Sequence, residues 1–167
     1  MRAEDREGLL GVFGDPRVMA SFGVPPFAAA EMDRWIERHL EHQRTYGYGL
    51  FTVILRADGA VIGDCGLEHI DLGPELGYDL RSDHWGRGLA TEAATAVRDF
   101  AFGVLALPWV VRLIRVGNDA SRRVAEKIGM TSADETERGG VRYRLYSIDG
   151  ELTGSPSSHE RGRRARS

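Results

Sequence analysis

The chain has 167 residues, of which 42% are hydrophobic and 28% are charged, and its formal net charge is −3. This length and composition predict one soluble globular domain, with no apolar run that reads as a transmembrane span or a signal peptide. The single cysteine, Cys65, excludes an internal disulfide framework and favours the reducing cytoplasm, and the scattered histidines predict no metal site.

The charge is unevenly distributed along the chain. The residues after Gly154 include four arginines and one glutamate, a net charge of +3, so the rest of the chain carries −6. An acidic body favours a cationic amine ligand over nucleic acid. The segment 153–167 has no apolar pattern, and we predict a disordered, arginine-rich tail behind a domain that spans residues 1–152.

Two amphipathic helices are predicted in the first third of the chain. The first covers residues 3–13, and Asp15-Pro16 ends it. The second covers residues 28–43, with His39 and His42 expected on its exposed face and an apolar stripe that consists of Met32, Trp35, Ile36 and Leu40.

Three strands joined by short turns follow, at residues 50–55, 61–70 and 75–80. Asp58-Gly59 lies between two alternating apolar runs, which is a strong hairpin signal. Short turns imply an antiparallel sheet, and this arrangement disfavours a doubly wound dinucleotide-binding fold.

A glycine-rich loop connects the third strand to a long helix, in which apolar residues recur from Leu89 to Val104. The first amides of a helix lack intrahelical partners and attract anions. Without Cβ atoms at Gly86 and Gly88 a phosphate can approach closely, and Arg87 adds a positive charge. We therefore predict a pyrophosphate-binding loop, although the loop alone leaves open a turn that uses glycine only for its backbone angles.

Two other phosphate-binding motifs fit this loop poorly. No Gly-Lys-Ser/Thr follows at the spacing of a Walker A loop. Thr91 stands where the Rossmann fingerprint has its third glycine, and no acidic residue follows about 20 residues later at a strand end.

A strand, a shorter helix and a hairpin are predicted after the long helix. Residues 109–116 are rich in Val, Ile and Leu, which predicts a strand covered on both faces and parallel to the strand before the long helix. Asn118 opens a shorter helix that ends before Gly129. Residues 131–137 and 141–148 predict a closing hairpin.

Two of these segments resemble one protein family. The run Trp85-Gly86-Arg87-Gly88-Leu89-Ala90 resembles the acetyl-CoA pyrophosphate loop of the GNAT superfamily of N-acetyltransferases, whose usual pattern is Gln/Arg-x-x-Gly-x-Gly/Ala. Trp85 at the first position, with Ala-Thr-Glu-Ala following the loop, is similar to the RimJ/RimL-like branch, the ribosomal-protein N-terminal acetyltransferases. The segment from Asn118 to Met130 resembles the family's segment after the fifth strand.

The resemblance extends from near the start of the chain to about residue 150. It implies the GNAT fold, an α/β (α+β) architecture with a mixed, mostly antiparallel sheet flanked by helices. Family members usually begin with an extra strand, for which this chain has no room before residue 3. The strand at residues 50–55 is therefore expected at a sheet edge.

The implied activity is acetyl-CoA-dependent transfer of an acetyl group to a primary amine, by direct attack through a tetrahedral intermediate. The acceptor is either a protein N-terminal α-amine or a small-molecule amine. The alternatives are an antibiotic- or polyamine-type acetyltransferase and a CoA-binding module without turnover. The resemblance implies no metal, no nucleic acid and no membrane partner, in a cytoplasmic monomer or homodimer.

The resemblance also implies the residues that bind acetyl-CoA. Asn118 is expected to contact the pantetheine arm, and a backbone amide near Leu80 is expected to donate to the oxyanion. The alternative for Asn118 is simple helix capping. The complete set expected to bind acetyl-CoA is Leu80, Arg81, Trp85, Gly86, Arg87, Gly88, Leu89, Ala90, Thr91, Asn118 and Ser121.

Acetyl transfer needs a base, an oxyanion donor and an acid for the departing thiolate. Ala125 occupies the position where many family members carry a tyrosine acid. The resemblance to the RimJ/RimL-like branch, where a serine near the helix start is the usual candidate, implies Ser121 as the acid, with a capping serine as an equal alternative. The resemblance implies Glu75 as the favoured base, because the family's Glu-Leu-Gly-Tyr segment lines the acceptor cleft. Alternation places Glu75 on one face of its strand with Gly77 and Asp79. Glu68 on the neighbouring strand is the second choice, acting through water. The alternative for both carboxylates is a solvated strand position.

Overall fold

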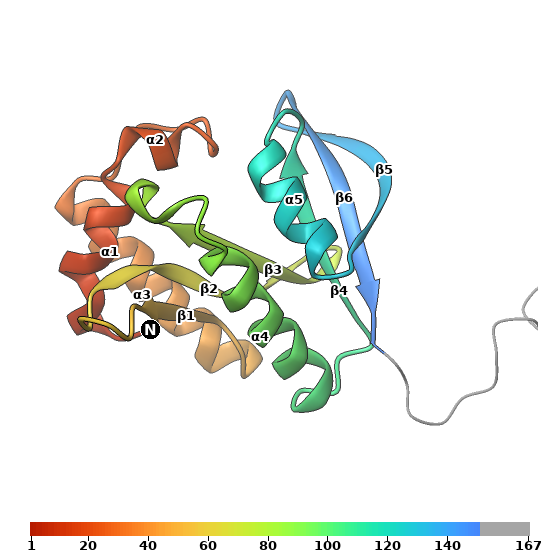
Figure 1. The fold of residues 1–167 in the computed structure, drawn as a ribbon, viewed down its shortest axis with the longest axis horizontal. Coiled ribbons are helices and arrows are strands. Elements are labelled where there is room, and N and C mark those ends of the chain that lie inside the picture. The colour runs from red at the N-terminus through yellow and green to blue at the C-terminus, as the bar shows by residue number, and fades with distance from the viewer. Residues whose placement is uncertain (151–167) are drawn as a thin grey trace, which may run out of the picture.

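The computed structural model describes residues 1–150, in which six strands form one sheet in the order β1-β2-β3-β4-β6-β5 (Figure 1). The strands are β1 (Leu50–Ile54), β2 (Val61–Ile70), β3 (Gly73–Leu80), β4 (Trp109–Arg115), β5 (Thr131–Arg138) and β6 (Val141–Asp149). The helices are α1 (Arg6–Phe13), α2 (Pro16–Met19), α3 (Ala29–Tyr46), α4 (Leu89–Gly103) and α5 (Asp119–Lys127), and short 3₁₀ turns lie at Ala3–Asp5 and Ser82–His84.

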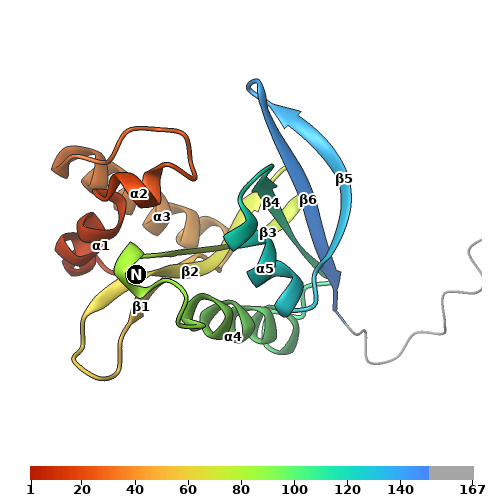
Figure 2. The ribbon, with the colours of Figure 1, turned by 45° about the horizontal axis from the view of Figure 1, so that its top comes forward.

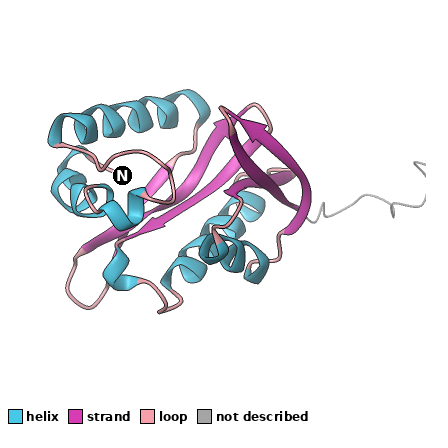
Figure 3. Ribbon diagram, turned by 90° about the horizontal axis from the view of Figure 1, so that it is seen from above, coloured by secondary structure: helices cyan, strands magenta, loops and turns pink. Residues whose placement is uncertain are grey.

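Helices cover both faces of the sheet (Figure 3). The N-terminal helices α1–α3 and the pair α4 and α5 form separate groups on either side of β2 and β3 (Figure 2). An apolar cluster joins α1, α2 and α3 through residues such as Leu9, Phe13 and Met32. A second cluster joins α4 and α5 to the sheet and includes Cys65 and Leu76. Strand alternation therefore directs apolar side chains of β2 and β3 toward α4 and α5, and leaves the opposite face for polar ones.

The sheet opens between its two halves. β1, β2 and β3 are antiparallel neighbours, and α4 carries the chain from β3 to β4 as a parallel crossover. The register of β3 and β4 contains one pair, Glu75 with Val111, whereas β4 and β6 are paired over seven residues. Beyond Glu75 the strands β3 and β4 are therefore no longer held together by a regular ladder.

The predicted architecture is confirmed: a mixed sheet flanked by helices, with β1 at an edge of the described sheet. The predicted helix 28–43 runs three residues further, to Tyr46, and the predicted helix 3–13 begins as a 3₁₀ turn. The predicted tail, residues 153–167, lies outside the described residues. None of the described helices is both long and apolar enough to span a membrane.

Two expectations about side-chain exposure are wrong. His39 is buried rather than exposed, because it continues the inner stripe of α3 and its ring centroid lies 4.1 Å from that of Trp35. His42 is half-buried, and its Nε2 accepts a hydrogen bond from the backbone N–H of His69 on β2. Val104, expected on the apolar face of the long helix, is 70% exposed because α4 ends at Gly103.

Candidate active site

A cavity of about 1010 Å³ lies where β3 and β4 diverge. It is bounded by the N-terminus of α4, the first turns of α5, the segment around α2 and the carboxylates of β2 and β3. Most of the predicted site residues line this one cavity: Glu68, Glu75, Leu80, Trp85, Gly86, Gly88, Leu89, Ala90, Thr91, Asn118 and Ser121. The structure thus brings together segments that are far apart in the sequence.

Two predicted ligand contacts do not line the cavity. The guanidinium of Arg81 pairs with Asp83, with 2.7 Å between Nη2 and Oδ2. Arg87 is exposed at the tip of the loop. Both residues lie beside the cavity rather than in its wall, and their contact with a ligand stays a prediction.

The glycine loop has the conformation expected for binding an anion. Gly86 and Gly88 have φ of +73° and +81°, which only glycine adopts at little cost. A Cβ atom at either position would meet no other atom within 4 Å, so the space in front of the loop is open. Trp85 fixes the loop to the end of β3, because its Nε1–H donates to the Leu80 carbonyl at 2.8 Å.

The start of α4 supplies free donors to this open space. The N–H of Glu92 donates to the Gly88 carbonyl, so the amides of Leu89, Ala90 and Thr91 precede the first complete turn. Arg123 and Lys127 of α5 also line the cavity. Helix-terminal amides with two nearby cations suit a diphosphate.

The first turn of α5 faces the same cavity. The side-chain carbonyl of Asn118 accepts from the Ser121 backbone N–H at 3.1 Å, so Asn118 does cap the helix. Capping uses only its oxygen, and the side-chain NH₂ is left to donate to a ligand. The helix cap and the ligand contact therefore do not compete for the same atom.

Ser121 is hydrogen-bonded to Tyr78 of β3, a residue that was not singled out from the sequence. The Ser121 hydroxyl donates to the Tyr78 hydroxyl at 3.1 Å, and the Tyr78 hydroxyl donates to the Ser121 carbonyl at 2.8 Å. Burial raises the pKa of Tyr78, so its hydroxyl is neutral near pH 7. No local signal marks this contact, because the two residues are 43 positions apart.

The end of β3 directs a backbone donor into the opening. The Arg81 N–H donates to the Ile62 carbonyl of β2 at 2.8 Å. Because N–H groups alternate between the two edges of a strand, the Leu80 N–H points away from β2, toward β4. The structure therefore leaves the Leu80 amide directed at the gap between the strands, where the sequence expected an oxyanion donor.

The opposite face of the sheet carries two cross-strand carboxylate pairs, Glu68 with Glu75 and Asp64 with Asp79. Glu75 Oε1 accepts from the Leu113 backbone N–H of β4 at 2.9 Å and lies 3.7 Å from the guanidinium of Arg112. The carboxylate of Glu75 thus bridges β3 and β4 beyond their last paired residues.

Glu68, the other carboxylate of this pair, has a raised pKa and lies beside His39. Burial raises its pKa, and the negative charge of Glu75 adds to the effect. Its Oε1 lies 3.4 Å from Nδ1 of His39. Burial, followed by the charges of Arg38 and His42, lowers the pKa of His39 to about 4, so this imidazole is neutral near pH 7. Its Nε2 accepts from Arg38, which leaves the proton on Nδ1, toward Glu68.

Asp64 and Asp79 were not singled out from the sequence as site residues. Asp64 is fully buried, and within residues 1–150 neither of its oxygens has a hydrogen-bond partner. Burial raises the pKa of Asp64 well above its ordinary value, and the charge of Asp79 adds to this. Burial likewise raises the pKa of Asp79, which lines the cavity.

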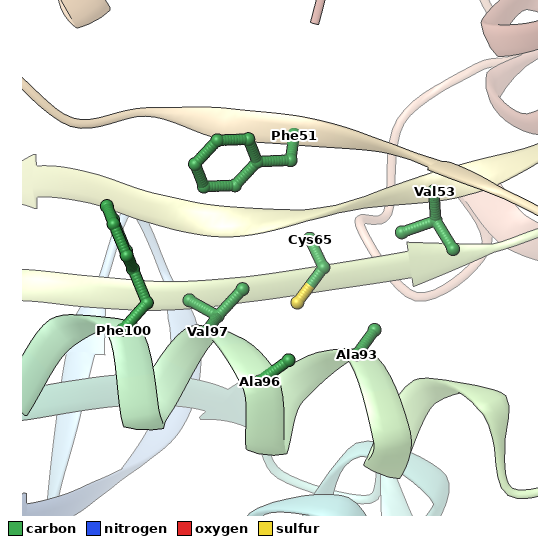
Figure 4. Close-up of a pocket in the computed structure, with 7 residues that line it drawn as sticks. All are labelled: Phe51, Val53, Cys65, Ala93, Ala96, Val97 and Phe100. Atoms are coloured by element: carbon green, nitrogen blue, oxygen red, sulfur yellow. The ribbon is translucent and has the colours of Figure 1, made fainter. Parts of the chain in front are cut away.

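A second, smaller cavity of about 270 Å³ lies between the β1 edge and α4 (Figure 4). Phe51 and Val53 of β1 face Ala93, Val97 and Phe100 of α4, with the Cys65 sulfur between them. Burial strongly raises the pKa of the Cys65 thiol, so it does not supply a nucleophilic thiolate. This cavity has no polar side chain for chemistry.

Among residues 1–150, no three His, Cys, Asp or Glu side chains are grouped so as to hold a metal ion. The large cavity is lined by carboxylates, hydroxyls, cations and backbone amides.

Comparison with known proteins gives consistent matches. Residues 1–131 match the family model described as acetyltransferase (GNAT) domain. YkkB of Bacillus subtilis (strain 168) is 35% identical over 136 residues, which cover 78% of this chain and 78% of YkkB.

Solved structures agree with this match. The acetyltransferase from Agrobacterium tumefaciens str. C58 superposes with a TM-score of 0.76 at 30% identity, over 89% of this chain and 86% of that chain. The ribosomal-protein-S5-alanine acetyltransferase from Vibrio fischeri superposes with a TM-score of 0.77 over 93% of both chains. At 16% identity this second match supports the fold alone.

Proposed function

The chain belongs to the acetyltransferase (GNAT) domain family and is an acetyltransferase, and we propose that it transfers acetyl from acetyl-CoA to a primary amine by direct attack. The observation that carries this proposal is the single cavity that runs from the N-terminus of α4 to the carboxylates of β2 and β3. A coenzyme and an amine can meet there, at the gap between two strands.

Acetyl-CoA is assigned to the α4 and α5 side of the cavity. The amides that open α4 would bind its diphosphate, and the Asn118 side-chain NH₂ would donate to its pantetheine arm. The Leu80 N–H would then donate to the thioester oxygen, on which negative charge develops as the amine attacks. Ser121 and Tyr78 form a neutral hydroxyl pair beside this point, suited to protonating the departing thiolate.

The amine is assigned to the side that carries Glu68 and Glu75. A general base needs a free lone pair and a pKa close to the working pH. Glu75, the first choice from the sequence, already accepts from Leu113 and pairs with Arg112. Glu68 faces the cavity with a raised pKa, so we assign the base to Glu68 and a positioning role to Glu75.

The acceptor is proposed as a protein N-terminal α-amine or a small-molecule amine. The likeness of the Trp85 loop to the RimJ/RimL-like branch puts N-terminal peptides first among acceptors to test. The acidic carboxylates around the amine side also suit a small cationic amine. We also propose a cytoplasmic location, because the single cysteine of the sequence favours a reducing compartment.

Free thiol release from acetyl-CoA, measured across N-terminal peptides and small amines, tests this proposal. Glu68→Gln should lower kcat by about 10²–10⁴-fold, the usual contribution of a general base, with CoA affinity unchanged. In the wild type the rate should fall as pH falls through the raised pKa of Glu68, and Glu68→Gln should lose this dependence.

Glu135→Gln, on β5, is the matched control and should behave as the wild type. Tight CoA binding with no thiol release from any acceptor would instead support a CoA-binding module without turnover.

A further inference from the structure

The gap between β3 and β4 contains the guanidinium of Arg112. Arg112 lies on β4, one residue beyond the last position paired with β3, and is only 17% exposed. Its Nη1 lies 3.7 Å from Glu75 Oε1, and its guanidinium carbon lies 4.8 Å from the centre of the Tyr78 ring. A Cβ atom at Gly77 would lie 3.8 Å from Nη1, at ordinary van der Waals distance, so the guanidinium lies directly beside β3 at this position.

One donor of this guanidinium, Nε, is buried and is not satisfied by the described residues. The Glu75 oxygen nearest to it already accepts from the Leu113 N–H, and 3.7 Å is too long for a hydrogen bond. Arginine has five N–H donors, and native proteins rarely leave buried ones unpaired. Unpaired donors that line a cavity point to a ligand with an acceptor atom.

The place of Arg112 in the cavity indicates which acceptor atom of a ligand it would bind. Arg112 lines the same cavity as the glycine loop and Glu68, at the place where the two strands begin to diverge. The Leu80 amide is directed into this gap from β3, and Arg112 enters it from β4. In the proposed function the coenzyme arm lies between the strands, so its thioester oxygen is the acceptor that we assign to this gap.

We propose that Arg112 is a further catalytic residue, which donates to the thioester oxygen of acetyl-CoA and stabilises the oxyanion formed when the amine attacks. This inference rests on the proposed function of the cavity. The amine nitrogen forms a bond to the carbonyl carbon, and the carbonyl electron pair moves to the oxygen that Arg112 faces. When that pair returns, the carbon–sulfur bond breaks and its electrons leave on sulfur. The amine proton passes to Glu68, and the thiolate takes a proton from the Ser121–Tyr78 pair or from water.

The surroundings of Arg112 make its charge effective. A cation in a partly buried site interacts with a developing anion more strongly than one in water. Its charge also disfavours the protonated form of an amine bound beside it, which leaves the nucleophile free. Glu75 acts here as a positioning residue, because it holds Arg112 from β3 while it accepts from Leu113 of β4.

Kinetics with Arg112→Ala test the role in turnover. We expect kcat to fall by at least about 100-fold, the effect of losing one oxyanion donor, with little change in CoA affinity. Guanidinium chloride at tens of millimolar, far below its denaturing range, should restore part of the rate. Urea, which has the same shape but no charge, should not. Arg144→Ala on β6, which removes an arginine paired with Glu135, should leave kcat unchanged.

Infrared spectra of bound, ¹³C-labelled acetyl-CoA test the contact without any acceptor. The thioester carbonyl band should lie at lower frequency in the wild type than in Arg112→Ala, because donation to the oxygen weakens the C=O bond. This readout separates the two proposals: a wild type without turnover would refute the proposed function even where the band shifts.

Two results would overturn the assignment of Arg112. One is a folded Arg112→Ala variant with wild-type kcat or with a loss that guanidinium does not restore. The other is a carbonyl band at the same frequency in both proteins. If Arg112→Ala does not fold, Arg112→Met fills the gap without the charge. For this variant too, a wild-type kcat or a carbonyl band at the wild-type frequency would overturn the assignment.

Discussion

Replacing His39 tests how the acceptor side of the site is built, because this imidazole lies buried between Trp35 and Glu68. The folded protein holds the pKa of His39 at about 4, mainly through burial, whereas an unfolded chain gives histidine about 6.5. Between these pH values the unfolded chain binds a proton at residue 39 and the folded chain does not. The free energy of unfolding should therefore decrease as pH falls from about 6.5 to about 4.

The size of this effect follows from the difference between the two pKa values. At about 1.4 kcal/mol per pH unit, the difference corresponds to about 3 kcal/mol. For a domain of this size, 1 kcal/mol changes Tm by roughly 2–4 °C, so the wild type should lose roughly 6–12 °C relative to a variant without the titrating group. His39→Leu places an apolar side chain in the α3 stripe and removes the titrating group.

Urea unfolding of both proteins from pH 7.5 to pH 4 measures the difference. Arg38→Met is a graded control, because the charge of Arg38 is the second cause of the lowered pKa, and its curve should fall between the other two. Parallel curves for the wild type and His39→Leu across this range would refute the reasoning, since no proton uptake would then be linked to residue 39.

Two further predictions concern CoA binding at the glycine loop and the protonation of Asp64. Gly88→Val should weaken CoA binding by at least about tenfold in calorimetric titration, since it strains a φ of +81° and fills the open space before α4. The control is Gly59→Val, at a φ of +75° in the β1–β2 turn. This control should lose similar stability and keep its CoA affinity. Equal loss of affinity in both would count against the loop as the diphosphate site. Asp64→Asn should raise Tm at pH 8, because the raised pKa of Asp64 makes the wild type lose stability as pH rises, and this gain should shrink toward pH 4 in thermal scans. A gain that is the same at both pH values would contradict a buried, proton-holding carboxyl.

The local elements of this protein were determined by short stretches of sequence. The Asp58-Gly59 turn, the Asn118 cap and the positive φ values at Gly86 and Gly88 depend on residues within a few positions of one another. Apolar periodicity likewise predicted the strands and the longer helices in their correct order, whereas the four-residue helix α2 (Pro16–Met19) was missed. Because such signals are local, the glycine loop and its helix could be predicted without the fold, and anion binding there is the hypothesis that they support.

The composition of the reaction site was decided only by the tertiary structure. The Leu113 amide reaches Glu75 across 38 residues and Tyr78 reaches Ser121 across 43, and no local pattern encodes either contact. Arg112 occurs in an apolar run that reads as a covered strand, and only the divergence of β3 and β4 makes its place a cavity wall. His39 was misplaced for a related reason: its polarity suggested solvent, whereas packing against Trp35 and the sheet holds it neutral and buried. Burial and long-range pairing set charge and pKa, and these exist only once the chain has folded.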